Sequence, residues 1–139
     1  MSNMSREQMD KVVNDHFMYE ATNDIAGVLR TFTDDIEHEI VGGPDGPLHG
    51  KAALRRFYER LFDDVNGERV EPVMRLYGDD FLVDETIWIG EIVDGRTFKL
   101  ERRSGNVRIR LLHVFHLRDG LIAKENVWFD RDEIERQVA

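Results

Sequence analysis

The chain has no cysteine and only three prolines among its 139 residues. Without cysteine it can form no disulfide and offers no thiol nucleophile. It also lacks any run of about 18 apolar residues, the length that a membrane-spanning helix needs. Its first residues, MSNMSREQMD, do not contain the apolar segment of a signal peptide. We therefore expect a cytoplasmic protein.

Positive charge is scarce as well. The chain carries 19 Lys and Arg against 28 Asp and Glu, which gives a formal net charge of −9 and a pI of about 5.0. Its basic clusters are short, such as Arg55-Arg56 and Arg102-Arg103, whereas a nucleic-acid-binding domain carries an extended basic patch. The acidic balance also disfavours anionic membranes. We therefore expect neither nucleic acid nor a membrane as a partner.

What is present is the composition of an ordinary folded protein, with 41% hydrophobic and 34% charged residues. A chain of this length can bury a core of its own. No internal repeat, low-complexity segment or linker divides it. The sequence therefore predicts a single domain over residues 1–139.

The first half of the chain has mainly helical patterns. Ser5 and Gln8 form a capping box that predicts a helix over 9–20, and Asn23 or Asp24 can cap a short second helix. The segment DIEHEI, residues 35–40, alternates between apolar and acidic residues and predicts a half-buried strand. A glycine-rich turn follows, and then a third amphipathic helix over 51–65.

The second half predicts strands near 70–77, 80–90, 96–103, 107–117 and 121–129. The later strands are separated by short turns such as Asp119-Gly120, which favour hairpins. The last residues, 131–139, predict a closing helical turn. Helices followed by hairpin-linked strands indicate an α+β fold. We expect a cone: a curved antiparallel sheet wrapped around the N-terminal helices, with a central pocket.

Several ionisable residues share a strand or helix face with apolar residues. His113 lies in the apolar row of RIRLLHVFHL, residues 108–117, and His38 and Glu125 lie in similar rows on their strands. His16 has apolar neighbours on the first helix. Each group alone is readily explained as a satisfied core residue or, for the carboxylates, as a partner of an arginine. Burying several unpaired polar groups in one interior would cost about 1–3 kcal/mol each, which favours a ligand site.

Three segments of the chain resemble the nuclear transport factor 2-like superfamily in its SnoaL-like and ketosteroid isomerase-like branch. They are NDIAGVLRTFTDDIEHEI, GPLHGKAALRRFYERLF and LLHVFHLRDGLIAKENVWFD. The resemblance covers about residues 9–137. It implies the cone fold, but the superfamily hosts isomerases, cyclases, epoxide hydrolases, dehydratases and non-catalytic modules. The resemblance therefore does not fix a reaction.

The resemblance also places family site positions on this chain. His113 matches the pocket histidine of SnoaL-like polyketide cyclases. The aspartate that those cyclases carry on the last strand corresponds to Val127, and the general base of ketosteroid isomerases corresponds to Ile40. Their oxyanion-hole tyrosine falls near His16. Two family carboxylate positions are therefore apolar here, although Glu125 lies two residues before Val127.

We predict catalytic and ligand-binding residues on this basis. A carboxylate paired with an imidazole makes a usable general base. The predicted catalytic residues are His113, Glu125, Asp84 and His38. The predicted ligand-binding residues are His16, Tyr19, Trp88, Phe115 and Val127.

Two hypotheses about function remain open. The first is a cofactor-free enzyme that isomerises, cyclises, dehydrates or hydrolytically opens a small, mostly apolar carbonyl, polyketide-like or terpenoid molecule. The second is a non-catalytic ligand-binding or dimerisation module of the same fold. No metal is expected, because His113 and His116 point to opposite faces of a strand and no tight histidine pair occurs on a helix. No motif for a nucleotide or flavin cofactor is present.

Both hypotheses include a homodimer, because one face of the bent sheet would remain uncovered. On alternation alone, the candidate contact residues are Thr86, Ile89, Leu112, Val114, His116 and Trp128.

Overall fold

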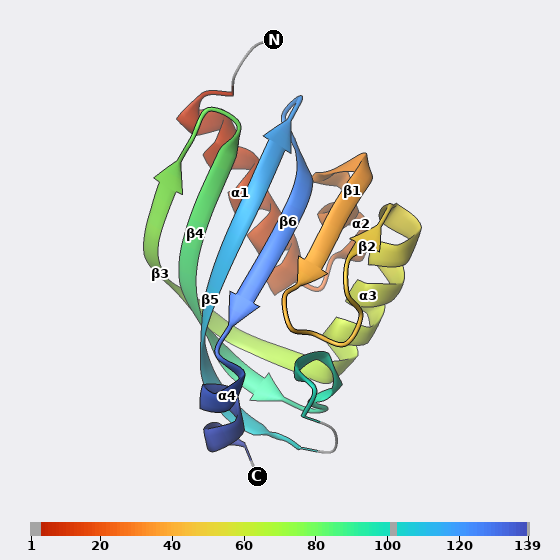
Figure 1. Ribbon diagram of the computed structural model, residues 1–139, viewed down its shortest axis with the longest axis vertical. Helices are drawn as coiled ribbons and strands as arrows, with labels where there is room; N and C mark the ends of the chain where they lie inside the picture. The colour runs from red at the N-terminus through yellow and green to blue at the C-terminus, as the bar shows by residue number, and fades with distance from the viewer. Residues whose placement is uncertain (1–3, 101–102, 139) are drawn as a thin grey trace.

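The computed structural model describes residues 4–100 and 103–138, and consists of helices packed on one curved sheet (Figure 1). The helices are α1 (Arg6–Ala21), α2 (Ile25–Arg30), α3 (Lys51–Asp64) and α4 (Arg131–Gln137), with a 3₁₀ turn, η1 (Arg96–Phe98). None of the helices in the described residues is long and apolar enough to cross a membrane.

Side-chain caps fix the beginnings of α1 and α2. Ser5 and Gln8 form the expected capping box at the start of α1. Asp24 caps α2 by accepting a hydrogen bond from the backbone N–H of Gly27 at 2.9 Å. These local signals are readable in the sequence, and the predicted helices are confirmed.

Six strands form one sheet in the order β2-β1-β6-β5-β4-β3. Every neighbouring pair is antiparallel except β1 and β6, which run parallel. The predicted α+β class is confirmed, but the sheet is mixed rather than wholly antiparallel. The strands are β1 (Phe32–Ile40), β2 (Leu48–His49), β3 (Val65–Tyr77), β4 (Phe81–Ile92), β5 (Gly105–Arg118) and β6 (Leu121–Phe129).

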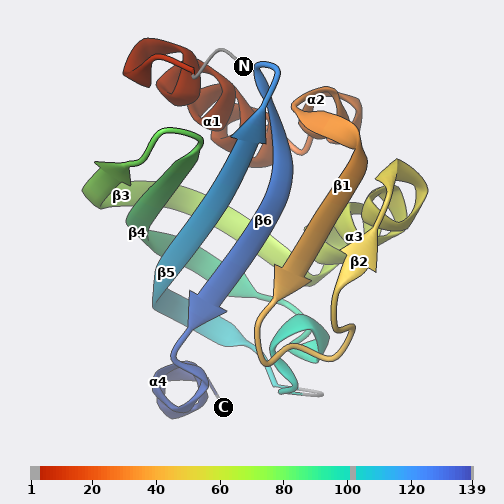
Figure 2. The same cartoon turned by 45° about the horizontal axis from the view of Figure 1, so that its top comes forward.

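The sheet bends around the helices and remains open. Figures 1 and 2 show α1 and α3 on the same side of the sheet, with the long strands β3, β4 and β5 curving across its lower end. Asp119 and Gly120 both have positive φ, 55° and 79°, which is the conformation of a tight two-residue hairpin turn between β5 and β6. The result is the predicted α+β cone.

Two apolar clusters fill the cone. The larger packs α1, α2 and α3 against β1, β5 and β6, and includes the fully buried residues Val13, Phe32 and Leu54. The smaller lies around η1 and α4, and includes Phe98 and Ile134. Because both clusters contribute walls to the cavity described below, the core also shapes the site.

One predicted strand is wrong. Residues 96–98 form η1 instead, and Lys99 ends that turn with a φ of 58°. An isolated bridge between Gly95 and Leu100 closes the turn, and the buried carboxylate of Asp64 binds Arg96. These tertiary contacts override the strand pattern, while 101–102 lie outside the described residues.

Two predictions about strand faces also differ from the structure. A bulge shifts the register between β5 and β6: Leu117 pairs with Ile122, whereas the preceding His116 pairs with Lys124. Ile122 is therefore buried, and the alternation of inward and outward side chains from Leu121 to Glu125 is broken. Thr86 was expected at a dimer contact, but it is only 5% exposed and lines the cavity beside Trp88. Thr86 therefore belongs to the inner face of β4.

An arginine ties α1 to the sheet. Arg75 Nε donates to Asp84 Oδ2 at 2.8 Å, and Arg75 Nη1 donates to Asp10 Oδ1 at 2.8 Å. Asp84 is 3% exposed, so removing its partner leaves a buried carboxylate without its counter-charge.

We expect Arg75→Ala to lower the free energy of unfolding by about 2–4 kcal/mol for this reason. The matched control is Arg110→Ala, because Arg110 binds Glu85 but is 73% exposed, and exposed pairs contribute less than about 1 kcal/mol. Urea denaturation of the variants measures both values. If both variants lost the same free energy of unfolding, Arg75 would not stabilise the buried carboxylate of Asp84.

Candidate functional site

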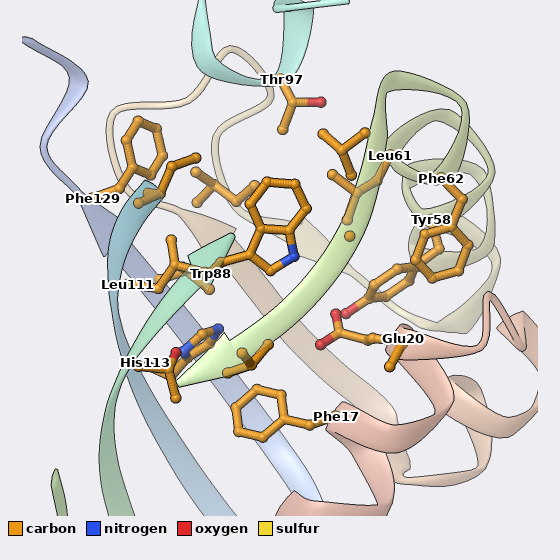
Figure 3. Close-up of a pocket in the computed structure, with 18 of the residues that line it drawn as sticks. Phe17, Glu20, Tyr58, Leu61, Phe62, Trp88, Thr97, Leu111, His113 and Phe129 are labelled. Carbon is orange, nitrogen blue, oxygen red and sulfur yellow. The ribbon is translucent and has the colours of Figure 1, made fainter. Parts of the chain in front are cut away.

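A cavity of about 490 Å³ lies between the helices and the inner face of the sheet (Figure 3). That size is typical of a small-molecule site. Exposed side chains such as Met18 and Val70 mark its opening to solvent. Its apolar wall includes Phe17, Leu61, Phe62, Trp88, Leu111 and Phe129.

Trp88 is the largest side chain of that wall. It fits because Gly90, on the same strand, has no side chain: a Cβ there would lie 2.6 Å from Trp88 Cη2. A Cβ at Gly67 on β3 would lie 3.3 Å from Trp88 Nε1. The indole therefore occupies space that two neighbouring glycines leave open.

Polar groups from five elements line the same cavity. They are Glu20 on α1, Tyr58 on α3, His38 on β1, His113 on β5 and Glu125 on β6. In Figure 3 the oxygens of Glu20 and Tyr58 point toward each other, and His113 lies across the cavity from them. A molecule in the cavity would therefore meet polar groups from opposite sides.

Strand order explains why three of these groups meet. β6 lies between β1 and β5, with Glu125 directly opposite His38 in the parallel pair. The Nε2 atoms of His38 and His113 each lie 3.9 Å from Glu125 Oε2. The sequence could not establish whether His113 and Glu125 lie close together, and in the structure they do.

A third imidazole approaches Glu125 from the helix side. His16 is fully buried, and its Nε2 lies 3.3 Å from Glu125 Oε1 and 3.4 Å from Glu20 Oε1. His16 does not itself line the cavity. It lies behind the two carboxyl groups and links them.

These contacts displace the pKa values of the two carboxyl groups in opposite directions. Burial raises the pKa of Glu125, but His16, His38 and His113 outweigh it and bring the pKa down from 4.5 to about 2. Burial raises the pKa of Glu20 from 4.5 to about 7, despite the opposing effect of His16. Glu125 is therefore held ionised at neutral pH, whereas Glu20 takes up a proton at a higher pH than a carboxyl group ordinarily does.

The remaining groups respond to burial and to these carboxylates. Burial lowers the pKa of His113 from 6.5 to about 4, and it also lowers the pKa of His38. Burial likewise opposes the charging of His16, but Glu20 and Glu125 outweigh it and raise the pKa of His16 to about 9. His16 is thus charged at neutral pH, whereas His38 and His113 are neutral.

Burial, Glu20 and Glu125 raise the pKa of Tyr58 well above 10. Its phenol therefore keeps its proton at neutral pH and remains a hydrogen-bond donor.

Not all predicted site residues reach the cavity. His113, Glu125, His38, Trp88 and Val127 line it.

Asp84, Tyr19 and Phe115 do not line the cavity. Asp84 is held by Arg75. Tyr19 lies beneath the guanidinium of Arg30. Phe115 is fully buried and stacks on the ring of His113. Strand or helix position alone did not separate cavity-facing residues from core residues, because the core and the cavity share one face of the sheet.

The sequence analysis missed Glu20 and Tyr58. Glu20 had a readable signal, since it follows His16 by four residues and such pairs lie on one helix face. Tyr58 lies on the apolar stripe of α3, where nothing in the pattern distinguishes a cavity phenol from a core aromatic. Within residues 4–100 and 103–138, no group of at least three His, Cys, Asp or Glu side chains is arranged to hold a metal ion.

The curved mixed sheet, its helices and the lined cavity define an α+β cone of the nuclear transport factor 2-like class. The chain belongs to the SnoaL-like domain family, whose model matches residues 13–125. The predicted family is therefore confirmed. No curated protein matches the chain.

Solved structures show the same fold at low sequence identity. A protein from Silicibacter sp. TM1040, provisionally described as a polyketide cyclase, has a TM-score of 0.80 and 18% identity, covering 99% of each chain. An LEH-like epoxide hydrolase from M. tuberculosis has a TM-score of 0.73 and 18% identity, covering 94% of this chain and 88% of that chain. A protein from Bacillus subtilis, provisionally described as an isomerase, has a TM-score of 0.77 and 14% identity, covering 94% and 92%.

His113 makes stability depend on pH. Its pKa in the folded protein is about 4, below the ordinary value of 6.5. A group with a lowered pKa contributes stability above its unfolded pKa, and that contribution is lost as the pH falls from 6.5 through 4. We expect a loss on the order of 3 kcal/mol over this window.

His113→Phe should remove that contribution and make the loss of stability between pH 6.5 and 4 smaller, leaving the part that comes from the lowered pKa of His38. His116→Phe is the control, because His116 is exposed on the outer face of the same strand. Denaturant unfolding at half-unit pH steps measures both. If His113→Phe and the wild type lost stability in parallel, His113 would not be held neutral in the folded protein.

Proposed function

We propose that the protein is a cofactor-free enzyme that transfers protons on a small, mostly apolar carbonyl, polyketide-like or terpenoid molecule. One observation carries the proposal: Glu20 and Glu125 line the same cavity with pKa values of about 7 and about 2. Neighbouring carboxyl groups whose environments separate their pKa values are typical of acid/base sites.

Glu20 is the best candidate for the proton-exchanging group. Its pKa is close to neutral pH, where a general acid or base works most effectively. Its side chain is 25% exposed, so it can contact a ligand. In contrast, Glu125 is 1% exposed and firmly ionised, which suits an orienting anion better than the general base that the sequence suggested.

Tyr58 and His113 would assist from the two sides of the cavity. The protonated phenol of Tyr58 can donate to an oxygen on which charge develops. His113 can present Nε2–H to Glu125 and leave Nδ1 as an acceptor; Nδ1 has no hydrogen-bond partner among the described residues. Glu125 would then stabilise the imidazolium if His113 accepted a proton.

The walls suit a ligand that is largely apolar. Trp88, Leu111 and Phe129 offer flat and branched hydrocarbon surfaces near His113 (Figure 3). The reactions open to such a site are isomerisation, cyclisation, dehydration and ring-opening hydrolysis. The cyclase, epoxide hydrolase and isomerase descriptions of the structural neighbours are consistent with that range.

A second candidate is a non-catalytic small-ligand-binding module. It is favoured by Ile40 and Val127, which are directly opposite each other in β1 and β6 and occupy positions where related enzymes carry carboxylates. Such a module would bind the same apolar molecules without exchanging their protons.

Proton exchange with solvent separates the two candidates. We expect the protein to incorporate deuterium from D₂O next to the carbonyl of at least one member of a panel of small apolar ketones and lactones, observed by NMR. Glu20→Gln should slow this exchange by about 10²–10⁴-fold, because it removes the proton-exchanging group.

The matched control is Glu59→Gln, since Glu59 is exposed on α3 and should leave the rate unchanged. Ligand binding without deuterium incorporation would favour the binding module. Unchanged exchange in Glu20→Gln would exclude Glu20 as the acid/base group.

We also propose that the outer face of β4, β5 and β6 pairs with a second copy of the chain. Trp128 is 38% exposed there, directly opposite the half-buried Leu112, and the half-buried Val114 lies two residues further along β5. Sedimentation velocity at micromolar concentration should show a dimer, which Trp128→Glu should dissociate by placing a charge in the apolar contact. A wild-type monomer under these conditions would contradict the proposal.

A further inference from the structure

His16 takes no part in the proton transfer described above, yet it contacts both carboxyl groups of the site. Its side chain is fully buried, and it lies outside the lining of the cavity. A titratable group in that position cannot meet the ligand. His16 can instead set the charge of Glu20 and Glu125, which line the cavity and can meet the ligand.

The hydrogen bonds of His16 fix the proton on one ring nitrogen. Thr31 Oγ1 donates its single hydrogen to the backbone carbonyl of Val28 at 2.6 Å. The same oxygen lies 3.1 Å from His16 Nδ1, so it can only accept there. Nδ1 therefore carries a hydrogen in either charge state of the ring.

The other ring nitrogen faces the two carboxyl groups. His16 Nε2 is 3.3 Å from Glu125 Oε1 and 3.4 Å from Glu20 Oε1. Neither Nε2 nor Glu125 Oε1 completes a hydrogen bond of ordinary geometry, but three unprotonated atoms at this distance would repel one another, and a proton on one of them removes that repulsion. Because imidazole is intrinsically more basic than a carboxylate, that proton belongs on Nε2.

The groups that face His16 come from every element packed around it. They are Glu20 on its own helix, His38 on β1, His113 on β5 and Glu125 on β6, while Tyr58 on α3 faces the two carboxyl groups. Tyr58 stays protonated, and charging His38 or His113 would place a second cation beside the first. A single imidazolium at His16 is the arrangement that these neighbours favour.

We propose that His16 is a positioning residue of the site: oriented by Thr31 and held as an imidazolium between Glu20 and Glu125, it keeps Glu125 ionised and leaves Glu20 as the carboxyl group that exchanges a proton with the ligand. The proposal rests on the proposed acid/base function for the role of Glu20. It also gives a physical reason why Glu20 and Glu125 differ in charge state. Both contact the same cation, but Glu125 also faces the rings of His38 and His113.

The first test is the protonation state of His16 in the wild-type protein. Long-range ¹⁵N–¹H NMR spectra distinguish an imidazolium from either neutral tautomer, and ¹³C spectra follow the carboxyl carbons of glutamate. We expect His16 to remain an imidazolium at pH 7 and to lose its proton near pH 9. Glu20 should titrate near pH 7, while Glu125 stays ionised down to the acid limit of the fold. A neutral His16 at pH 7 would overturn the proposal.

The second test removes the support of the imidazolium. Thr31→Val keeps the shape of the side chain but removes the oxygen that accepts from Nδ1–H. Because that hydrogen bond is stronger from the charged ring than from the neutral ring, the pKa of His16 should fall by about one unit. Thr33→Val is the matched control. Thr33 lies two residues later on β1 and is equally buried, but its hydroxyl donates to Asp35. An unchanged pKa of His16 in Thr31→Val would contradict the role of Thr31.

The third test removes the charge. In His16→Gln the pKa values of Glu20 and Glu125 should both rise, that of Glu20 by about one unit or more. The pH profile of deuterium exchange should move with Glu20. If Glu20 titrated in His16→Gln as it does in the wild type, His16 would not set its charge.

These results are distinguishable from failure of the proposed function. The wild-type and Thr31→Val titrations need no substrate, and they remain decisive if His16→Gln does not fold. A neutral His16 together with slowed exchange in Glu20→Gln would refute the positioning role and keep the enzyme. An imidazolium at His16 together with unchanged exchange in Glu20→Gln would refute the role of Glu20 as the exchanging group.

Discussion

A carboxylate in an apolar interior needs compensating charge and polar neighbours, and three imidazoles converge around Glu125: His16 supplies the positive charge, and the neutral rings of His38 and His113 supply polar neighbours. Each comes from a different element, so the requirement joins α1, β1, β5 and β6. The rings can surround one carboxylate only because β6 lies between β1 and β5 and α1 brings His16 to the same carboxyl group. The parallel pairing of β1 with β6 is therefore a condition for the site as well as a feature of the fold.

The same arrangement explains why the cavity has polar groups in distinct charge states. Of the three imidazoles, only His16 lies within 4 Å of two carboxyl groups, and it is charged, whereas His38 and His113 each lie within 4 Å of Glu125 alone and remain neutral. Glu20 lies at the edge of this cluster, where its carboxyl group keeps access to the cavity. In a SnoaL-like protein with apolar residues at Ile40 and Val127, acid/base chemistry would then depend on a carboxyl group that is carried by a helix instead of a strand.

Much of the fold was readable from local patterns, and the exceptions have physical causes. The capping box at Ser5 and the Asp119-Gly120 turn act within a few residues, so their signals survive in the sequence alone. Residues 96–98 depart from their strand pattern because buried Asp64, far away in the chain, binds Arg96. The bulge near Ile122 changes which side chains face inward. The pattern of alternating apolar and polar residues does not reveal an extra residue in a strand.

The sequence by itself determined the α+β class and the presence of His38, His113 and Glu125 on inward faces, because these follow from periodicity and local turn chemistry. The family followed from the resemblance of three segments to known proteins. Only the tertiary structure decided which ionisable groups lie close enough to shift one another's pKa values. Asp84 and Glu125 both occupy inward strand positions, yet Asp84 meets Arg75 and Glu125 meets imidazoles. Glu20 and Tyr58 joined the site because α1 and α3 bring them together across the cavity. The pKa of a buried group depends on its neighbours in space, and those neighbours come from distant parts of the chain.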